Sequence, residues 1–215
     1  RLGNTKLREL RRSGIHHVRV SPDQTMDGAV ASYLADPNVE FAEPNFTLQA
    51  MRAPNEPAFN LLWGMENTGQ TLGTAGADIK AKLAWDRVTG SPNVVVAVID
   101  SGLDYNHQDF TTTGVITPEG IVTGPNVFFN PRELAGNGLD DDGNGRIDDV
   151  IGIDVFNGTS DPFDDNGHGT HVSGTIGAIG NNSLGVVGVN WNVKIAPCKF
   201  LDSTGNGSIA DAVIC

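Results

Sequence analysis

The sequence predicts an α/β protein with a parallel sheet, preceded by a small α+β unit. Residues 94–99, VVVAVI, form the longest apolar run, and such a β-branched run is typical of a parallel strand that is buried on both faces. The expected elements that follow alternate helix, strand and helix, which is the order of an α/β fold. A length of 215 residues suits one large domain with a smaller appendage.

The appendage is expected in residues 1–50. Expected strands at 15–20 and 39–42 flank a helix that runs from Asp27, the expected N-cap, to Ala35. The apolar stripe of this helix would contain Ala31 and Leu34. Prolines among polar residues at 50–60 indicate a linker or an extended arm.

The larger domain is expected in residues 51–215. A helix is expected over 78–86, and residues 111–166 are rich in Gly, Asp, Asn and Pro, so they should be mostly loop. Further along the chain, a small-residue helix is expected over 168–179, a strand over 193–201 and a helix from Ser208 onward.

Composition limits the classes of function. The formal net charge is −12, and the first 50 residues hold six basic and six acidic residues, so the excess lies in 51–215. Because no basic patch offsets this charge, we expect no nucleic-acid partner. The longest apolar run is far too short for a membrane span. The two cysteines, Cys198 and Cys215, are too few for a disulfide framework, and we expect them as small buried apolar side chains.

The first motif is Val-Ile-Asp-Ser-Gly at residues 98–102. A buried parallel strand that ends in Asp100 places a carboxylate at the carboxyl edge of the sheet, where open α/β sheets bind ligands. The alternative is an aspartate that only caps a loop.

The second motif is Asn-Gly-His-Gly-Thr-His-Val-Ser-Gly, which begins at Asn166. Asn166 or Gly167 can cap the helix, which places His168 in the first turn. A neutral imidazole needs a partner that fixes its tautomer before it acts as a general base, and Asp100 is suited to this. A zinc pair of His168 and His171 is the competing interpretation, but the Glu of His-Glu-x-x-His is missing, and we expect His171 to be a packed helix residue.

These two blocks resemble the subtilisin-like serine proteases, or subtilases, in sequence and in chain order. The resemblance implies that residues 1–50 are the end of an inhibitory propeptide, through Val-Glu-Phe-Ala-Glu-Pro-Asn at 39–45, and that 51–215 are the N-terminal portion of the peptidase domain. It implies that Asp100 orients His168, which deprotonates a serine nucleophile. It also implies that an extended polypeptide substrate binds along Asn166, Leu201, Gly205, Asn206 and Gly207.

The sequence departs from the family because the block Gly-Thr-Ser-Met-Ala is absent. Ser101, Ser160 and Ser173 lack the required context. We therefore expect a fragment of a longer serine endopeptidase, cut before its serine and inert by itself. A catalytically inactive calcium-binding or inhibitory module with a vestigial triad is the alternative, and a metallohydrolase is a third hypothesis.

The third motif is the acidic loop at residues 140–149, Asp-Asp-Asp-Gly-Asn-Gly-Arg-Ile-Asp-Asp. It matches a calcium-loop pattern in which oxygen ligands at alternate positions converge on one cation. The expected ligands are the side chains of Asp140, Asp142 and Asn144, the Arg146 carbonyl, and Asp148 or Asp149 in place of the usual closing Glu. A solvated acidic loop is the alternative.

A second calcium site is implied by the resemblance alone. It would use the side chains of Asp109, Asn182 and Glu56 and the carbonyls of Gly180, Leu184 and Val186. Calcium sites of modest affinity suit extracellular modules, and with the propeptide resemblance they predict a secreted protein.

Overall fold

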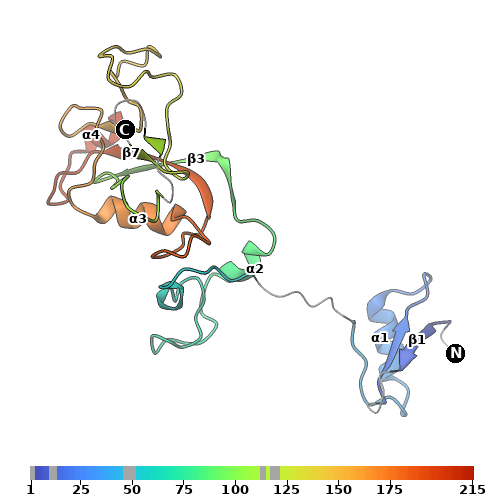
Figure 1. The fold of residues 1–215 in the computed structure, drawn as a ribbon. Helices are drawn as coiled ribbons and strands as arrows, with labels where there is room; N and C mark the ends of the chain where they lie inside the picture. The colour runs from blue at the N-terminus through green and yellow to red at the C-terminus, as the bar shows by residue number, and fades with distance from the viewer. Residues whose placement is uncertain (1–2, 10–13, 46–51, 112–114, 117–121) are drawn as a thin grey trace. The chain divides into compact units, whose positions relative to one another are not determined.

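The computed structural model describes residues 3–9, 14–45, 52–111, 115–116 and 122–215. The chain divides into two compact units, Arg1–Ala50 and Met51–Cys215. Each unit is described by itself below (Figure 1).

The first unit pairs two antiparallel strands beside one helix. Strand β1 (Thr5–Glu9) pairs with β2 (His16–Arg19), with an irregular register between Lys6 and Arg8. Helix α1 spans Met26–Leu34. The strand expected near 15–20 is confirmed, whereas β1 had no apolar alternation to reveal it because all five of its residues are exposed.

Three details of this unit differ from expectation. Thr25, not Asp27, is the N-cap of α1, because its Oγ1 accepts the N–H of Gly28, while Asp27 lies in the first turn. The helix buries Ala29, and the expected stripe residues Ala31 and Leu34 are both exposed. The strand expected over 39–42 is wrong, since these residues pair with no strand in the described part of the chain.

The second unit contains a parallel sheet of β3 (Gly90–Asp100), β7 (Asn192–Lys199) and β6 (Ile153–Asp154), in the order β3-β7-β6. Asp100 and Asp154 both pair with Lys199, so the three strands end at one edge. Helix α3 (His168–Gly177) packs against β3 and β7 (Figure 1). The predicted α/β class with a parallel sheet is therefore confirmed. The core beside this sheet contains Val98, Leu103, Phe110, Val127, Ile151, Val193 and Ile195.

The expectation that residues 94–99 are buried on both faces is wrong. Val98 alone among them is buried, and Val94, Val95 and Ile99 are each 45% to 50% exposed. The reason is that β3 forms the edge of the three-stranded sheet, where it pairs with β7 on one side. The composition of residues 94–99 is typical of a central parallel strand, but the strand lies at the edge of the described sheet.

The remaining elements surround the sheet. A 3-10 turn spans Phe59–Leu61, and helix α2 spans Ala81–Trp85. The helix begins later than expected because Lys80 has a left-handed backbone, with φ 58°. Trp85 packs against Trp191 in a second core cluster, with ring centroids 5.3 Å apart. Two short strands, β4 (Val115–Ile116) and β5 (Val122–Thr123), form an antiparallel pair.

The C-terminal helix brings the two cysteines together, contrary to the expectation that they are separate apolar side chains. The helix expected from Ser208 onward is α4, which spans Ile209–Ile214 and is capped by the Ser208 side chain. It brings Cys215 to within 5.8 Å, Cα to Cα, of Cys198 in β7, and the two form a disulfide. The cysteines are therefore bonded and not two separate apolar side chains. No helix among the described residues has the length and apolar character needed to cross a bilayer.

Candidate active site

Asp100 and His168 meet at the carboxyl edge of the sheet. Asp100 ends β3, and His168 begins α3. His168 Nδ1 lies 2.8 Å and 2.9 Å from the two carboxylate oxygens of Asp100. Because a carboxylate only accepts hydrogen bonds, Nδ1 carries the proton and Nε2 keeps its lone pair. The hydrogen bond expected from the two sequence motifs is present.

The two side chains of this pair differ in their exposure to solvent. The His168 side chain is 64% exposed, whereas Asp100 is 13% exposed. The hydrogen bond and charge of Asp100 raise the pKa of His168 above its ordinary value, and the charge of Asp164 adds to this. The pair thus presents an open imidazole nitrogen, fixed from behind by a carboxylate.

A buried hydrogen-bond network holds the two motifs together. Ser101 Oγ donates to Asp164 at 2.9 Å and accepts the N–H of Gly169, also at 2.9 Å. Asp164 also accepts from the N–H groups of Asn166 and Gly167, and from Thr170 N and Oγ1. Burial alone would raise the pKa of Asp164, but the hydrogen bonds from Thr170, Gly167 and Asn166 lower it below its ordinary value. A carboxylate here satisfies the otherwise unpaired N–H groups at the start of α3.

Gly169, which follows His168, lies where α3 and the end of β3 approach each other closely. A Cβ at Gly169 would lie 2.2 Å from the carbonyl oxygen of Gly102, so α3 approaches the end of β3 only because residue 169 has no side chain. Gly167 is the N-cap of α3, with φ 98°, a conformation that favours glycine.

The segment 201–207 begins beside this pair, where Leu201 N lies 3.4 Å from Asp100 O. It is named here the substrate wall because Leu201, Gly205, Asn206 and Gly207 are among the residues expected to bind substrate. Leu201 and Gly207 form a β-bridge, and Gly205 has φ 82°. Asn166 Nδ2 donates to Ser203 O at 3.0 Å, which ties the turn before His168 to the wall. The structure therefore brings together the five residues expected to bind substrate, Asn166, Leu201, Gly205, Asn206 and Gly207.

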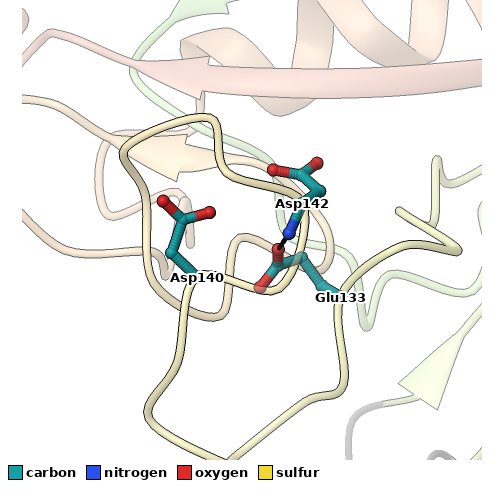
Figure 2. Close-up of side chains that lie close together, drawn as sticks. All are labelled: Glu133, Asp140 and Asp142. Carbon is teal, nitrogen blue, oxygen red and sulfur yellow. Dashed lines mark hydrogen bonds between the residues drawn. The ribbon is translucent and has the colours of Figure 1, made fainter.

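The acidic loop folds around its own first residue. Asp140 accepts the N–H groups of Gly143, Asn144 and Gly145. Asp140, Asp142 and Glu133 each place a carboxylate oxygen within 4.8 Å of the others (Figure 2). Figure 2 also shows the bond from Asp142 N to Glu133, which is 3.1 Å long.

Sequence reasoning missed Glu133, since it lies outside the loop pattern. Glu133 is 3% exposed, and its Oε2 has no hydrogen-bond partner among the described residues. It lies seven residues before Asp140, and no acidic residue stands between the two, so no local pattern could have indicated it.

Asp148 and Asp149, the two candidates for the closing ligand of the acidic loop, have different hydrogen-bond partners. Asn144 Nδ2 donates to Asp149 Oδ2 at 3.0 Å, and Asn144 Oδ1 accepts the N–H of Arg146. Asp148 instead accepts the N–H groups of Asn137 and Gly138. Burial raises the pKa of Asp149, and the charges of Asp142 and Asp140 add to this. Asp149, rather than Asp148, is thus connected to the residues of the loop.

The residues of the second expected cation site also converge. Glu56 accepts the N–H of Asn182 at 2.9 Å, Asp109 accepts the N–H of Val186 at 3.1 Å, and Asn182 Oδ1 accepts the N–H of Leu184. Glu56 and Asp109 are 5% and 3% exposed. Glu56 Oε2 and Asp109 Oδ1 are buried and have no hydrogen-bond partner within the described ranges.

Glycines permit the close packing of this second cluster. A Cβ at Gly185 would lie 2.2 Å from Asp109 Oδ2, and one at Gly180 would lie 2.2 Å from the ring of Trp191. The loop from Gly180 to Val186 therefore fits against Asp109 because these positions lack side chains.

A model described as the subtilase family matches residues 91–213, which is more than half of the chain. The chain belongs to the subtilase family. A second model, the fervidolysin N-terminal prodomain, matches residues 1–45.

Several proteases are similar to this subtilase. Subtilisin-like protease 1 of Plasmodium berghei is 47% identical over 56% of this chain and 18% of its own length. An extracellular protease of Xanthomonas campestris is 32% identical over 97% of the chain and 34% of its own length. A thermophilic serine proteinase of a Bacillus species is 30% identical over 88% of the chain and 37% of its own length. The chain thus spans little more than a third of these relatives at most.

Among solved structures, a protease from Pseudoalteromonas arctica is 26% identical, with a TM-score of 0.47 over 75% of this chain and 42% of the other. The Aeromonas sobria serine protease is 25% identical, with a TM-score of 0.48 over 74% of this chain and 22% of the other.

Three serines of this subtilase, Ser101, Ser160 and Ser173, do not contact the imidazole of His168. Ser101 is fully buried in the network with Asp164, and Ser173 is also fully buried. The Ser160 hydroxyl donates to the carbonyl of Ile147. None of the three has a hydrogen bond to His168 in the described part of the structure.

The positions of His168 and His171 in this subtilase do not fit a zinc site. His168 Nδ1 is bonded to Asp100, and His171 is exposed on α3, which corrects the expectation that it is packed. No group of three metal-ligating side chains in the described ranges includes either histidine.

Proposed function

We propose that the protein containing this chain is a serine endopeptidase, with Asp100 and His168 as two members of its catalytic triad. The observation that carries the proposal is the contact of His168 Nδ1 with both oxygens of Asp100. Family membership and the extracellular and serine protease relatives support it. The serine would come from residues that follow Cys215, because the Gly-Thr-Ser-Met-Ala block is not in this sequence.

In this mechanism Asp100 fixes the imidazole with its proton on Nδ1. His168 Nε2 then takes the proton of the serine hydroxyl as the serine oxygen attacks the peptide carbonyl. The imidazolium that forms is stabilised by the carboxylate behind it, and it gives its proton to the departing amine. Water repeats the same steps on the acyl-enzyme and restores the serine.

The proposed substrate is an extended polypeptide that lies along the substrate wall. Gly205, Asn206 and Gly207 are exposed. Gly205 N, Asn206 N and Asn206 O bond to Asp202, and the remaining backbone groups of these three residues would pair with a peptide strand. Asn166, tied to Ser203, would border the same strand. Residues 1–50 are proposed to act as the propeptide of this enzyme, which is supported by the match of residues 1–45 to a prodomain model.

We propose that calcium binds at both oxygen clusters. A buried carboxylate oxygen without a donor is costly, and a hard cation removes that cost. The loop site would use Asp140, Asp142 and Glu133, with Asn144, the Arg146 carbonyl and Asp149 or Asp148 as further ligands. The second site would use Glu56, Asp109, Asn182 and the carbonyls of Gly180, Leu184 and Val186. Calcium would hold these loops in place and take no part in the proton transfers.

The protein is also proposed to be secreted, and the 215-residue chain to need its missing nucleophile for activity. Secretion is supported by the extracellular protease relative and by calcium sites suited to calcium-rich surroundings. The 215-residue chain by itself is proposed to be inert, since it lacks the nucleophile block.

The test uses the full-length protein and a quenched fluorescent peptide. The wild type should hydrolyse the peptide, and His168→Ala should lose about 10⁶-fold in kcat, as is typical when the triad base is removed. His171→Ala, on the same helix but outside the pair, is the matched control and should retain activity. A folded wild type without hydrolysis of any peptide tested would favour the alternative, an inactive calcium-binding or inhibitory module.

A further inference from the structure

Lys199 is a buried charge that the proposed mechanism does not use. It is the last residue of β7 and is 1% exposed. A buried ammonium group is stable only when its donors are paired. Its Nζ donates to Ser101 O at 2.8 Å, Asp165 Oδ1 at 2.6 Å and Leu201 O at 2.8 Å. These partners use all three N–H donors of the ammonium.

The three acceptors come from three segments that lie around the Asp100–His168 pair. Ser101 follows Asp100 at the end of β3. Asp165 lies three residues before His168, in the turn that leads into α3. Leu201 begins the substrate wall and pairs with Gly207. One side chain therefore connects the Asp100 strand end, the turn before His168 and the wall.

We propose that Lys199 is a positioning residue that sets the distance between the Asp100–His168 pair and a peptide bound along the substrate wall. This inference rests on the proposed peptidase function. Without the ammonium, Ser101 O and Leu201 O would have no donor from this side chain, and Asp165 would lose its cation. The wall would keep the backbone hydrogen bond from Leu201 N to Asp100 O, which is 3.4 Å long, but it would lose the side-chain link through the ammonium. A bound peptide would then shift relative to His168. A displacement of about 1 Å can cost about a hundredfold in rate.

A purely structural role predicts a different result. It would lower the melting temperature and leave kcat and KM unchanged for the molecules that remain folded. A positioning role predicts a loss that depends on how much of the substrate lies on the wall. The informative comparison is therefore between a short peptide that ends before the wall and a longer one that pairs along it.

The experiment uses the full-length protein with three variants, Lys199→Met, Asp165→Ala and Lys82→Met. Asp165 is 50% exposed, so its variant should fold even if Lys199→Met does not. Lys82 is the matched control, because it also pairs with a carboxylate, that of Glu66, at 2.7 Å. This pair does not involve the three segments that Lys199 connects. We measure kcat and KM with both peptides, the melting temperature, and binding of a non-cleavable long peptide in a His168→Ala background.

For Lys199→Met and Asp165→Ala we expect kcat/KM on the long peptide to fall by about tenfold to a hundredfold. The loss should appear in kcat, because a displaced peptide reacts more slowly, and in KM, because the wall holds the peptide less well. Non-cleavable peptide binding should weaken, and the short peptide should lose less than threefold. Lys82→Met should match the wild type on both peptides. Equal losses on the two peptides, or unchanged kinetics and binding in Asp165→Ala and in any folded Lys199→Met, would overturn the inference.

A failure of the proposed function has a different signature. A wild type that binds the non-cleavable peptide but cleaves neither substrate contradicts the peptidase proposal, while the binding comparison still decides on Lys199. A folded wild type that neither binds nor cleaves overturns both.

Discussion

Ser101 and Asp164 form a buried hydrogen bond of 2.9 Å between the residue after Asp100 and the turn that leads to His168. The same Ser101 hydroxyl accepts the N–H of Gly169. Residues from two segments that are 63 positions apart are thus fixed to each other behind the candidate catalytic pair. The orientation of His168 depends on this contact as well as on Asp100.

Asp164→Asn should reduce stability in a pH-dependent way. The pKa of Asp164 is lower in the folded state than its unfolded value of about 3.9. Its ionised form therefore contributes stability that is fully present above about pH 4 and is lost as pH falls through the folded pKa. The difference in unfolding free energy between wild type and variant should be largest near pH 6 and should shrink below pH 4. Urea unfolding of the full-length protein at several pH values measures it.

Ser101→Ala is the control for this experiment. It removes a buried hydrogen bond to the same carboxylate and should cost about 1–3 kcal/mol. Because a hydroxyl does not titrate in this range, the cost should depend far less on pH than that of Asp164→Asn. Identical pH profiles for the two variants would contradict the role assigned to the Asp164 charge.

Asp100→Asn should change both the titration of His168 and the rate. The pKa of His168 is raised above its ordinary value of about 6.5 by its contact with Asp100, so the charged form of that contact stabilises the fold below about pH 6.5 and is lost as pH rises through the folded pKa. In the variant the pKa should fall, which NMR of the ring protons measures. The acid limb of kcat/KM should move to lower pH, and kcat should drop about 10⁴-fold because the wrong tautomer is favoured. An unchanged pKa would contradict the assigned contact.

The sequence was most informative where short motifs carry the chemistry. The Asp100 and His168 blocks each have a strand end or a helix start beside them, and the sheet brings them together as expected. The acidic loop was also identified, because oxygen-bearing residues at fixed spacing are visible in a sequence. The residues of the second cluster were indicated by the family resemblance alone, since they are spread over separate segments of the chain.

The sequence was least informative about contacts between distant segments. Lys199 gains its importance from partners in distant segments, Ser101 and Asp165, and Glu133 from burial beside Asp140 and Asp142. No local pattern marks either residue. The Cys198–Cys215 bridge depends on α4 returning to the end of β7. The exposure of Val94 and Val95 depends on the position of β3 at the edge of the described sheet, which strand composition cannot show.

Calcium removal should destabilise the full-length protein through two separate sites. A ligand that binds only the folded state adds about 2.7 kcal/mol at a hundred times its Kd. We expect a chelator to lower the melting temperature, and Asp109→Ala and Asp140→Ala each to remove part of that response. Differential scanning calorimetry with and without calcium measures it, and the exposed Asp23→Ala is the control.

A comparison of Asp109→Ala with Asp140→Ala also shows which site gives the calcium response of the melting temperature. If Asp109→Ala alone abolishes the calcium response, the loop around Asp140 is merely acidic. A melting temperature that chelation leaves unchanged in the wild type would contradict both sites. Glu133→Gln should resemble Asp140→Ala if Glu133 is a ligand, since its Oε2 has no other described partner.

Removing the disulfide should weaken the C-terminal part of the second unit. The bridge closes a sequence separation of 17 residues that includes the substrate wall and α4. Constraining a loop of this size in the unfolded chain contributes about 3 kcal/mol. The double variant Cys198→Ala/Cys215→Ser should lose about this much unfolding free energy in urea.

Reduction of the wild type serves as the comparison for the double variant. A reducing agent should lower wild-type stability toward that of the variant and leave the variant unchanged. Equal stability of wild type and variant under oxidising conditions would show that the bridge adds nothing.

Covalent labelling of the full-length protein with a fluorophosphonate tests the peptidase assignment most directly. Such a probe reacts with a serine that a neighbouring imidazole activates. The account predicts one labelled serine per molecule, located by mass spectrometry outside residues 1–215, with labelling abolished in His168→Ala and strongly reduced in Asp100→Asn. A folded wild type that takes up no probe, or labelling that persists in His168→Ala, would contradict the account.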